Sequence, residues 1–152
     1  MPHALIGGLA LAHYGYGRGT QDIGWLVPEE SKDSVKRLFN SNGFKILHES
    51  DDVLQFEGLA PVDFLIARRP ISRKMIEDSF FSSSLRLKVV RAEDLIGLKI
   101  QAYSNDPKRK NKDLADIQEL ISLQENLDWE KIKSYADLFE AWSEISGLRS
   151  GS

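Results

Sequence analysis

The feature that most constrains this fold is a pair of glycines, Gly7 and Gly8, between two apolar segments. The run Ala4–Ile6 before them predicts a short strand, and the alanine- and leucine-rich residues 9–14 after them predict a helix. Glycines at such a junction let another backbone or a phosphate come close, because no Cβ intervenes. The start of the helix also offers free N–H groups to an anion. The pattern therefore predicts a strand, a tight turn and a helix at a candidate phosphate site.

A basic turn and an aspartate lead from this segment into a second apolar run. The turn covers residues 17–20, and Asp22 directly precedes the predicted strand Ile23–Val27. A carboxylate placed across a cleft from phosphate-binding backbone is how a metal–nucleotide site is built. Taken alone, Asp22 is also explained as a turn or capping aspartate.

The spacing of these residues resembles a known signature. Gly7-Gly8, thirteen residues and then the Asp-x-Asp position at the head of a strand look like the motif of the DNA-polymerase-β-like nucleotidyltransferase superfamily. Gly7 to Ala10, Arg18 to Thr20 and Asp22 are most similar to small bacterial nucleotidyltransferases, a branch that includes the toxins of AbiEii-type toxin–antitoxin systems. The resemblance covers about residues 4 to 121. It implies an α+β fold leaning towards α/β, with a mixed sheet, flanking helices and a helical C-terminal part.

The resemblance also implies a magnesium site. In the superfamily, two carboxylates two residues apart on one strand and a third on a neighbouring strand hold two divalent ions, which bind the triphosphate and activate the attacking hydroxyl. Asp22 matches the first carboxylate, and Asp63, inside the predicted strand 61–66, matches the third. Gly24 stands where the second belongs, so either the site is degenerate or another group replaces the ligand. The nearby candidates for a replacement are Asp51, Asp52 and Glu57.

Further site residues follow from the same resemblance. The predicted nucleotide-binding residues are Gly7, Gly8, Arg18, Thr20, Lys112 and Asp113. Lys99, on an otherwise apolar helix, is a predicted catalytic residue and phosphate partner. The alternative explanations are a tight turn for the glycines, and helix solvation or capping for the charged residues. Relatives carry an arginine near this point, and the run Lys108 to Lys110 either replaces it or is a solvated charge run.

Hydrophobic patterning organises the rest of the chain. A helix is predicted between Ser31 and Gly43, with Ser31 as its N-cap and Gly43 as its left-handed end. Strands are predicted at 44–48, 53–57 and 85–90, helices at 71–79, 92–103, 112–124, 129–135 and 136–145, and a basic loop at 105–111. The predicted organisation is a core at residues 1–91, a helical part of the same domain at 92–146 and a flexible tail at 147–152.

Composition narrows the function classes. The 152 residues include no cysteine, which excludes disulfides and thiolate metal sites, and no apolar run is long enough to span a membrane. No signal peptide precedes the first strand, so a cytoplasmic location is expected. The net charge of −3 argues against broad nucleic-acid binding. No helix precedes Ala4–Ile6, so either the protein is a trimmed member of its family or another segment covers the edge of that strand; an uncovered edge would be a route to a homodimer.

Three functions are compatible with the sequence. The first is Mg²⁺-dependent transfer of a nucleotidyl group from an NTP to a hydroxyl on tRNA, a protein or a small molecule. The second is a protein that keeps the nucleotide pocket or a partner surface without turnover. The third is a toxin neutralised by an antitoxin protein. With Gly24 in place of a carboxylate, we expect weak Mg²⁺–NTP binding and slow or absent turnover.

Overall fold

The chain forms two compact units, each built around its own core. The structure is a computed structural model that describes residues 1–17 and 23–150. The first unit comprises residues 1–13 and 17–91, and the second comprises residues 14–16 and 92–152. Asp22, Arg18 and Thr20 therefore lie outside the described residues.

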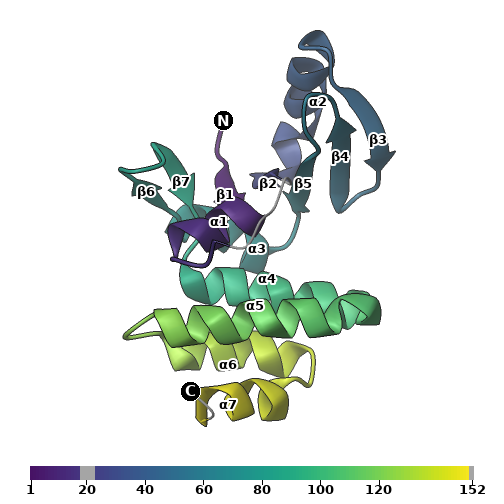
Figure 1. Ribbon diagram of the computed structural model, residues 1–152. Coiled ribbons are helices and arrows are strands. Elements are labelled where there is room, and N and C mark those ends of the chain that lie inside the picture. The colour runs from purple at the N-terminus through teal and green to yellow at the C-terminus, as the bar shows by residue number, and fades with distance from the viewer. Residues whose placement is uncertain (18–22, 151–152) are drawn as a thin grey trace. The chain divides into compact units, whose positions relative to one another are not determined.

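A mixed sheet forms the first unit, and its strands run in the order β3-β4-β5-β2-β1-β7-β6 (Figure 1). The strands are β1 Ala4–Ile6, β2 Ile23–Pro28, β3 Lys45–Glu49, β4 Val53–Glu57, β5 Val62–Ala67, β6 Phe80–Ser82 and β7 Leu87–Val89. The pairs β2–β5 and β1–β7 are parallel, and the other neighbours are antiparallel. The prediction that β1, β2 and β5 are neighbours is confirmed.

Three helices and a short 3₁₀ turn accompany this sheet. They are α1 Gly7–His13, the turn η1 Glu29–Ser31, α2 Lys32–Ser41 and α3 Pro70–Asp78. Ser31 precedes α2 as predicted but makes no side-chain capping bond. Gly43 adopts φ 87°, a left-handed conformation that glycine reaches without a Cβ penalty, so the predicted helix end is confirmed.

Buried and more exposed side chains alternate along β4 and β5, so one face of the sheet is buried there. Leu54 and Phe56 of β4 and Phe64 and Ile66 of β5 pack in one hydrophobic cluster with Val35 of α2. The residues between them in sequence point to the opposite face, because successive side chains of a strand alternate. That opposite face carries Asp63, and α2 does not cover it, because α2 packs on the cluster.

Four helices form most of the second unit: α4 Ala92–Asn105, α5 Lys110–Leu123, α6 Trp129–Leu138 and α7 Trp142–Ser150, with a 3₁₀ turn η2 Pro107–Arg109 (Figure 1). Helix α4 packs against α5 and α6, and α7 packs against the same two helices. The core is mainly aliphatic, and its largest fully buried side chains are Leu95, Ile96, Ile100, Ile117, Leu120, Ile132 and Ile145. A mixed sheet followed by helices confirms the predicted α+β class.

Another segment covers the edge of β1, which was one of the two alternatives, because β7 returns beside it and the Val90 N–H donates to Leu5 O at 3.2 Å. Three predictions differ from this architecture. The strand expected at 85–90 is shorter and pairs with β6, after a turn in which Arg86 has φ 58°. The expected loop at 105–111 is helical for most of its length, and α7 continues through residue 150, where a tail was expected.

The helical start at η2 has a local cause. The Asp106 side chain accepts a hydrogen bond from the Lys108 backbone N–H at 3.3 Å, and Pro107 occupies the first position, where its missing N–H costs nothing. None of the described helices combines the length and the hydropathy that crossing a bilayer requires.

Candidate functional site

The sheet register brings three of the predicted features to one place. On β2, Gly24 lies opposite Ile6 of β1 on one side and opposite Asp63 of β5 on the other. Residues directly opposite on neighbouring strands point to the same face, about 4.8 Å apart. The position of the missing carboxylate is therefore immediately beside Asp63, and the glycine turn that follows Ile6 lies at the same end of the sheet.

The glycine turn closely approaches β2. Gly7 has φ 72°, which L-residues with a side chain rarely adopt, and a Cβ built on it would lie 3.7 Å from the Gly24 backbone nitrogen. Helix α1 begins at Gly7 itself, two residues earlier than expected. The turn thus lies against the strand that carries the Asp-x-Asp position.

Gly24 itself is buried and closely packed. A Cβ at this position would lie 3.1 Å from Ile6 Cγ1 and 3.5 Å from Ile6 O. A side chain here needs a shift of a few tenths of an ångström in its neighbour. The absence of a carboxylate at this position is therefore matched by local packing that leaves little room for one.

The predicted metal pair of Asp22 and Asp63 is described only at Asp63, which is half-buried on β5. Across residues 1–17 and 23–150, no three or more His, Asp or Glu side chains are grouped so as to hold a metal ion. Asp22 is not among those residues, so the pair stays a prediction. The nucleotide contacts expected of Arg18 and Thr20 stay predictions for the same reason.

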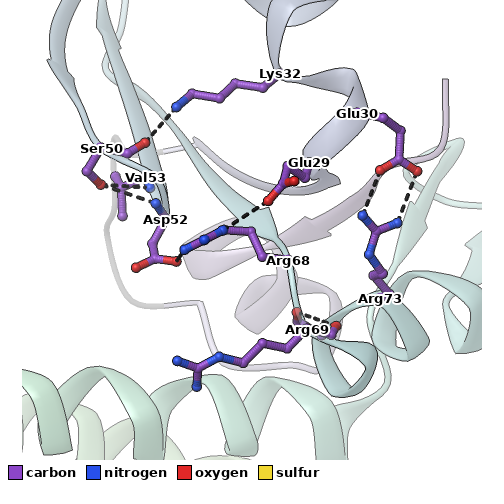
Figure 2. Close-up of polar contacts among 10 residues, drawn as sticks. Glu29, Glu30, Lys32, Ser50, Asp52, Val53, Arg68, Arg69 and Arg73 are labelled. Carbon is purple, nitrogen blue, oxygen red and sulfur yellow. Dashed lines mark hydrogen bonds and ion pairs between the residues drawn. The ribbon is translucent and has the colours of Figure 1, made fainter.

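Asp52 can be assigned a structural role at the other end of β5. Its carboxylate accepts a hydrogen bond from Arg68 at 3.3 Å, and Arg68 also bonds to Glu29 at 3.0 Å (Figure 2). The Asp52 carbonyl accepts from the Ile66 N–H at 2.9 Å. Because Ile66 lies three residues beyond Asp63, Asp52 and its neighbour Asp51 lie away from Gly24.

A second ion pair joins α3 to the η1 turn. Arg73 donates two hydrogen bonds to the carboxylate of Glu30, at 3.0 and 2.8 Å (Figure 2). The hydrogen bond from Arg73 lowers the pKa of the Glu30 carboxyl. These ion pairs attach α3 and the end of β5 to the η1 turn, which gives their charges a structural purpose.

Lys99 lies in a buried ion-pair network within the second unit. Its Nζ is 2.9 Å from Asp116 Oδ2 and 3.5 Å from Asp113 Oδ1, and only 7% of Lys99 is exposed. Both aspartates are buried, and Arg109 bonds to Asp113 at 3.0 Å. Two cations thus balance two buried carboxylates, which is the condition under which such charges are tolerated inside a protein. This geometry accounts for Lys99 and Asp113 without a ligand.

The other basic residues of the predicted segment are either exposed to solvent or paired with a carboxylate. Lys112 is exposed, although Asp113 beside it is buried. Lys110 pairs with Glu144 of α7 at 2.8 Å, and Tyr103 of α4 donates to the same carboxylate at 2.8 Å. The hydrogen bond from Lys110 lowers the pKa of Glu144, and burial raises that of Tyr103. Lys110 therefore connects α5 to α7, and Arg109 pairs within the start of α5.

A third buried acid, Asp94, was not anticipated from the sequence. Asp94, fully buried in the first turn of α4, accepts hydrogen bonds from the Tyr135 hydroxyl and, at 2.9 Å, from Lys131. Tyr135 reaches it by packing over Gly97, where a Cβ would lie 2.6 Å from the ring. The available signal was a glycine inside an otherwise apolar helix, which indicates close packing of another group.

Comparison with known proteins supports the architecture. No model of a protein family matches the sequence, and no curated protein matches it either. In structure the chain is similar to the antibiotic-resistance factor ANT(2'')-Ia in solution, with TM-score 0.67 and 16% identity over 99% of this chain and 86% of that one.

Two further structures are similar. One is ANT(2'')-Ia in complex with adenylyl-2''-tobramycin, with TM-score 0.66 and 16% identity over 93% of this chain and 88% of that one. The other is an antigenic nucleotidyltransferase-like protein from Paracoccidioides brasiliensis, with TM-score 0.55 and 14% identity over 97% and 84%. At these identities the likeness establishes the fold alone, and the chain has the α+β nucleotidyltransferase fold.

Proposed function

We propose that this protein binds an NTP with Mg²⁺ and transfers its nucleotidyl group to a hydroxyl of an acceptor. The observation that carries the proposal is the register Ile6–Gly24–Asp63, which puts the glycine turn and a carboxylate at one end of the sheet. Phosphate-binding backbone beside a metal-binding carboxylate is the arrangement that nucleotidyl transfer needs. The fold shared with ANT(2'')-Ia supports the same activity.

The residues take separate roles in this proposal. The backbone of Gly7 and Gly8 contacts the phosphates, with Arg18 and Thr20 as further contacts from the basic turn. Asp63 and Asp22 hold the divalent ion through hard oxygen ligands, which Mg²⁺ prefers. When bound, that ion supplies neutralisation of phosphate charge and lowers the pKa of the attacking hydroxyl.

The reaction itself is a substitution at phosphorus. The acceptor oxygen forms a bond to the α-phosphorus, the bond from that phosphorus to the bridging oxygen of the β-phosphate breaks, and pyrophosphate leaves with its electrons. The acceptor loses its hydroxyl proton to solvent or to a neighbouring carboxylate. Tobramycin is the first acceptor to test, because a neighbour holds the adenylyl product of tobramycin. Total tRNA and protein are the alternative acceptors to assay in the same way.

The role proposed for Lys99 is positioning rather than phosphate contact. It neutralises Asp113 and Asp116, and thereby holds α4 against α5. Asp113, engaged with Arg109, shares that role, and Lys112 is an exposed member of this segment.

Isothermal titration calorimetry with ATP, GTP, CTP and UTP, with and without Mg²⁺, tests nucleotide binding. Release of pyrophosphate in the presence of tobramycin or total tRNA tests transfer. Asp63→Asn is the informative variant, because it removes the charge and keeps the volume. We expect Mg²⁺-dependent binding that Asp63→Asn abolishes. Binding that is independent of Mg²⁺ and of Asp63 would refute the metal-assisted reaction and favour a nucleotide-binding protein without turnover.

The toxin function rests on the sequence resemblance to the AbiEii-type branch. It predicts that expression arrests growth of a bacterial host and that Asp63→Asn relieves the arrest. Growth unaffected by expression would exclude it, and an antitoxin is then not needed as a partner.

A further inference from the structure

The sheet face that bears Asp63 carries a second carboxylate at the Gly24 end. Gln55 of β4 lies directly opposite Asp63, so both side chains point to the same face. Glu57 follows Gln55 by two residues on the same strand, and it therefore points to that face as well. Burial agrees with this assignment, since Leu54 and Phe56 are buried while Gln55 is half-buried and Glu57 is exposed.

Glu57 also lies at the correct end of the sheet. Phe56 is opposite Val62 and Val62 is opposite Ile23, so Glu57 comes beside Pro61. The Pro61 carbonyl accepts from the Ile23 N–H at 3.4 Å, at the start of β2. Glu57 thus lies level with the point where the Asp-x-Asp strand begins.

The backbone around Glu57 is fixed by packing. The Phe44 ring covers Gly58, where a Cβ would lie 2.5 Å from Phe44 Cδ1. Phe44 in turn packs on Phe39, with ring centroids 5.0 Å apart. The turn after Glu57 is therefore held against the hydrophobic cluster, and the carboxylate projects from a defined position on the other face.

Two other carboxylates of this hairpin, Glu49 and Asp52, are bonded to cations away from this face. Glu49 accepts from Lys32 and Lys36 at 3.3 and 3.1 Å, and its strand partner is Leu54, on the α2 side. Asp52 bonds to Arg68 at the far end of β5. No described residue forms a hydrogen bond or an ion pair with the carboxylate of Glu57.

We propose that Glu57 supplies the metal-binding carboxylate that Gly24 lacks, an inference that rests on the proposed function. Side chains on diagonal positions of neighbouring antiparallel strands lie about 7–8 Å apart. Two oxygen ligands of one Mg²⁺ lie up to about 4 Å apart, and the flexible glutamate side chain covers the remaining gap. Asp63 and Glu57 then contact the same ion from adjacent strands, on the side of Asp63 away from Gly24.

Mn²⁺ binding to the full chain tests this ligand directly. Electron paramagnetic resonance measures free Mn²⁺ and needs no nucleotide, acceptor or activity. We expect Glu57→Gln to raise the Mn²⁺ dissociation constant by about tenfold to a hundredfold, the scale of a lost interaction with a charged group. Asp51→Asn is the matched control, since it removes the same charge from the far end of the same hairpin. It should leave the constant within about twofold of the original protein, because distant surface charges are screened.

The outcomes separate this inference from the proposed function. Mn²⁺ affinity weakened by Asp63→Asn but unchanged by Glu57→Gln overturns the role of Glu57 and leaves the proposed function standing. Equal weakening by Glu57→Gln and Asp51→Asn also overturns it, because only the general charge would then matter. No Mn²⁺ binding by the original protein at millimolar concentration overturns both. Thermal unfolding of each variant verifies the fold, and exposed Glu57 should tolerate glutamine with little change.

Discussion

Restoring a carboxylate at residue 24 is the sharpest perturbation that the sheet register suggests. The Gly24→Asp side chain would start 3.1 Å from Ile6 Cγ1, so packing opposes it before any charge effect. Overpacking of this kind costs about 1–3 kcal/mol, and the loss of glycine's freedom in the unfolded chain returns about 0.4–1 kcal/mol. Gly24→Ala isolates these two effects, and we expect it to be destabilised by roughly 1 kcal/mol, which for a chain of this size lowers Tm by about 2–4 °C.

The carboxylate introduced by Gly24→Asp also has an electrostatic effect, which is unfavourable without a bound metal and favourable with one. Residue 24 lies directly opposite Asp63, so without a metal two like charges about 5 Å apart repel by up to about 3 kcal/mol at an effective dielectric constant of 20. A bound Mg²⁺ converts that repulsion into shared ligation. We expect Gly24→Asp to unfold below Gly24→Ala in EDTA, and to gain about 1–3 kcal/mol in Mg²⁺–NTP affinity over the original protein.

Differential scanning fluorimetry in EDTA and in Mg²⁺, with calorimetry of Mg²⁺–ATP binding, measures both effects on the same proteins. Gly24→Asn completes the set, because it has the same shape as aspartate without the charge. A Mg²⁺-induced rise in Tm that is no larger for Gly24→Asp than for Gly24→Asn would refute the electrostatic reasoning. If Glu57 supplies the missing ligand, Gly24→Asp should also restore Mn²⁺ affinity to Glu57→Gln, and failure to do so would place the two carboxylates at different ions.

Three further predictions concern the helical unit. Gly97→Ala forces the Tyr135 ring away from a Cβ only 2.6 Å distant and should cost about 2–4 kcal/mol in urea unfolding; a cost below about 1 kcal/mol would contradict this packing. Lys99→Met removes one of the two cations that neutralise the buried Asp113 and Asp116 and should cost about 3–5 kcal/mol at pH 7, whereas Lys112→Met changes an exposed side chain and should be neutral. The Glu144 pKa is lowered from 4.5, so the ionised carboxylate stabilises the fold above that pH, and this stabilisation disappears as the pH falls through the lowered pKa. Glu144→Gln should therefore reduce the fall in Tm between about pH 5 and pH 3.

Patterns local to the chain predicted most of the first unit. The alternation of buried and exposed residues in β4 and β5 is visible in the sequence, and the predicted bounds 53–57 and 61–66 differ from the observed strands by at most one residue. The glycine turn after β1 was predicted for the same reason, since a strand and a helix on either side of Gly7 require it. These features depend on residues within a few positions of one another, so a sequence is sufficient to predict them.

Long-range pairing explains what was missed in that unit. The strand β7 returns beside β1 through a contact between Leu5 and Val89, more than eighty residues apart. No feature of either short segment indicates its partner, since both are simply apolar. The sequence of β1 therefore could not decide whether its edge was covered, and the suggested homodimer depended on that open question.

In the candidate site too, features that depend on local spacing were predicted, and features that depend on distant partners were not. The positions of Gly7, Gly24 and Asp63 were predicted by spacing, and the register brings them together. The assignment of Lys99 depended on what faces it, and its partners Asp113 and Asp116 lie on the next helix, across a turn that was expected to be a loop.

Burial decides between the two explanations of Lys99. A lysine that contacts phosphate needs free donors directed at solvent or ligand, whereas the Nζ of Lys99 lies within 3.5 Å of two carboxylates that are themselves fully buried. Moving Lys99 to a phosphate would take away one of the two cations that neutralise Asp113 and Asp116, which costs several kcal/mol. The positive charge is thus bound to the helical unit by its own carboxylates. On the first unit, Glu57 projects from the sheet with no described cation bonded to it. The divalent ion of the proposed function would supply a cation for Glu57.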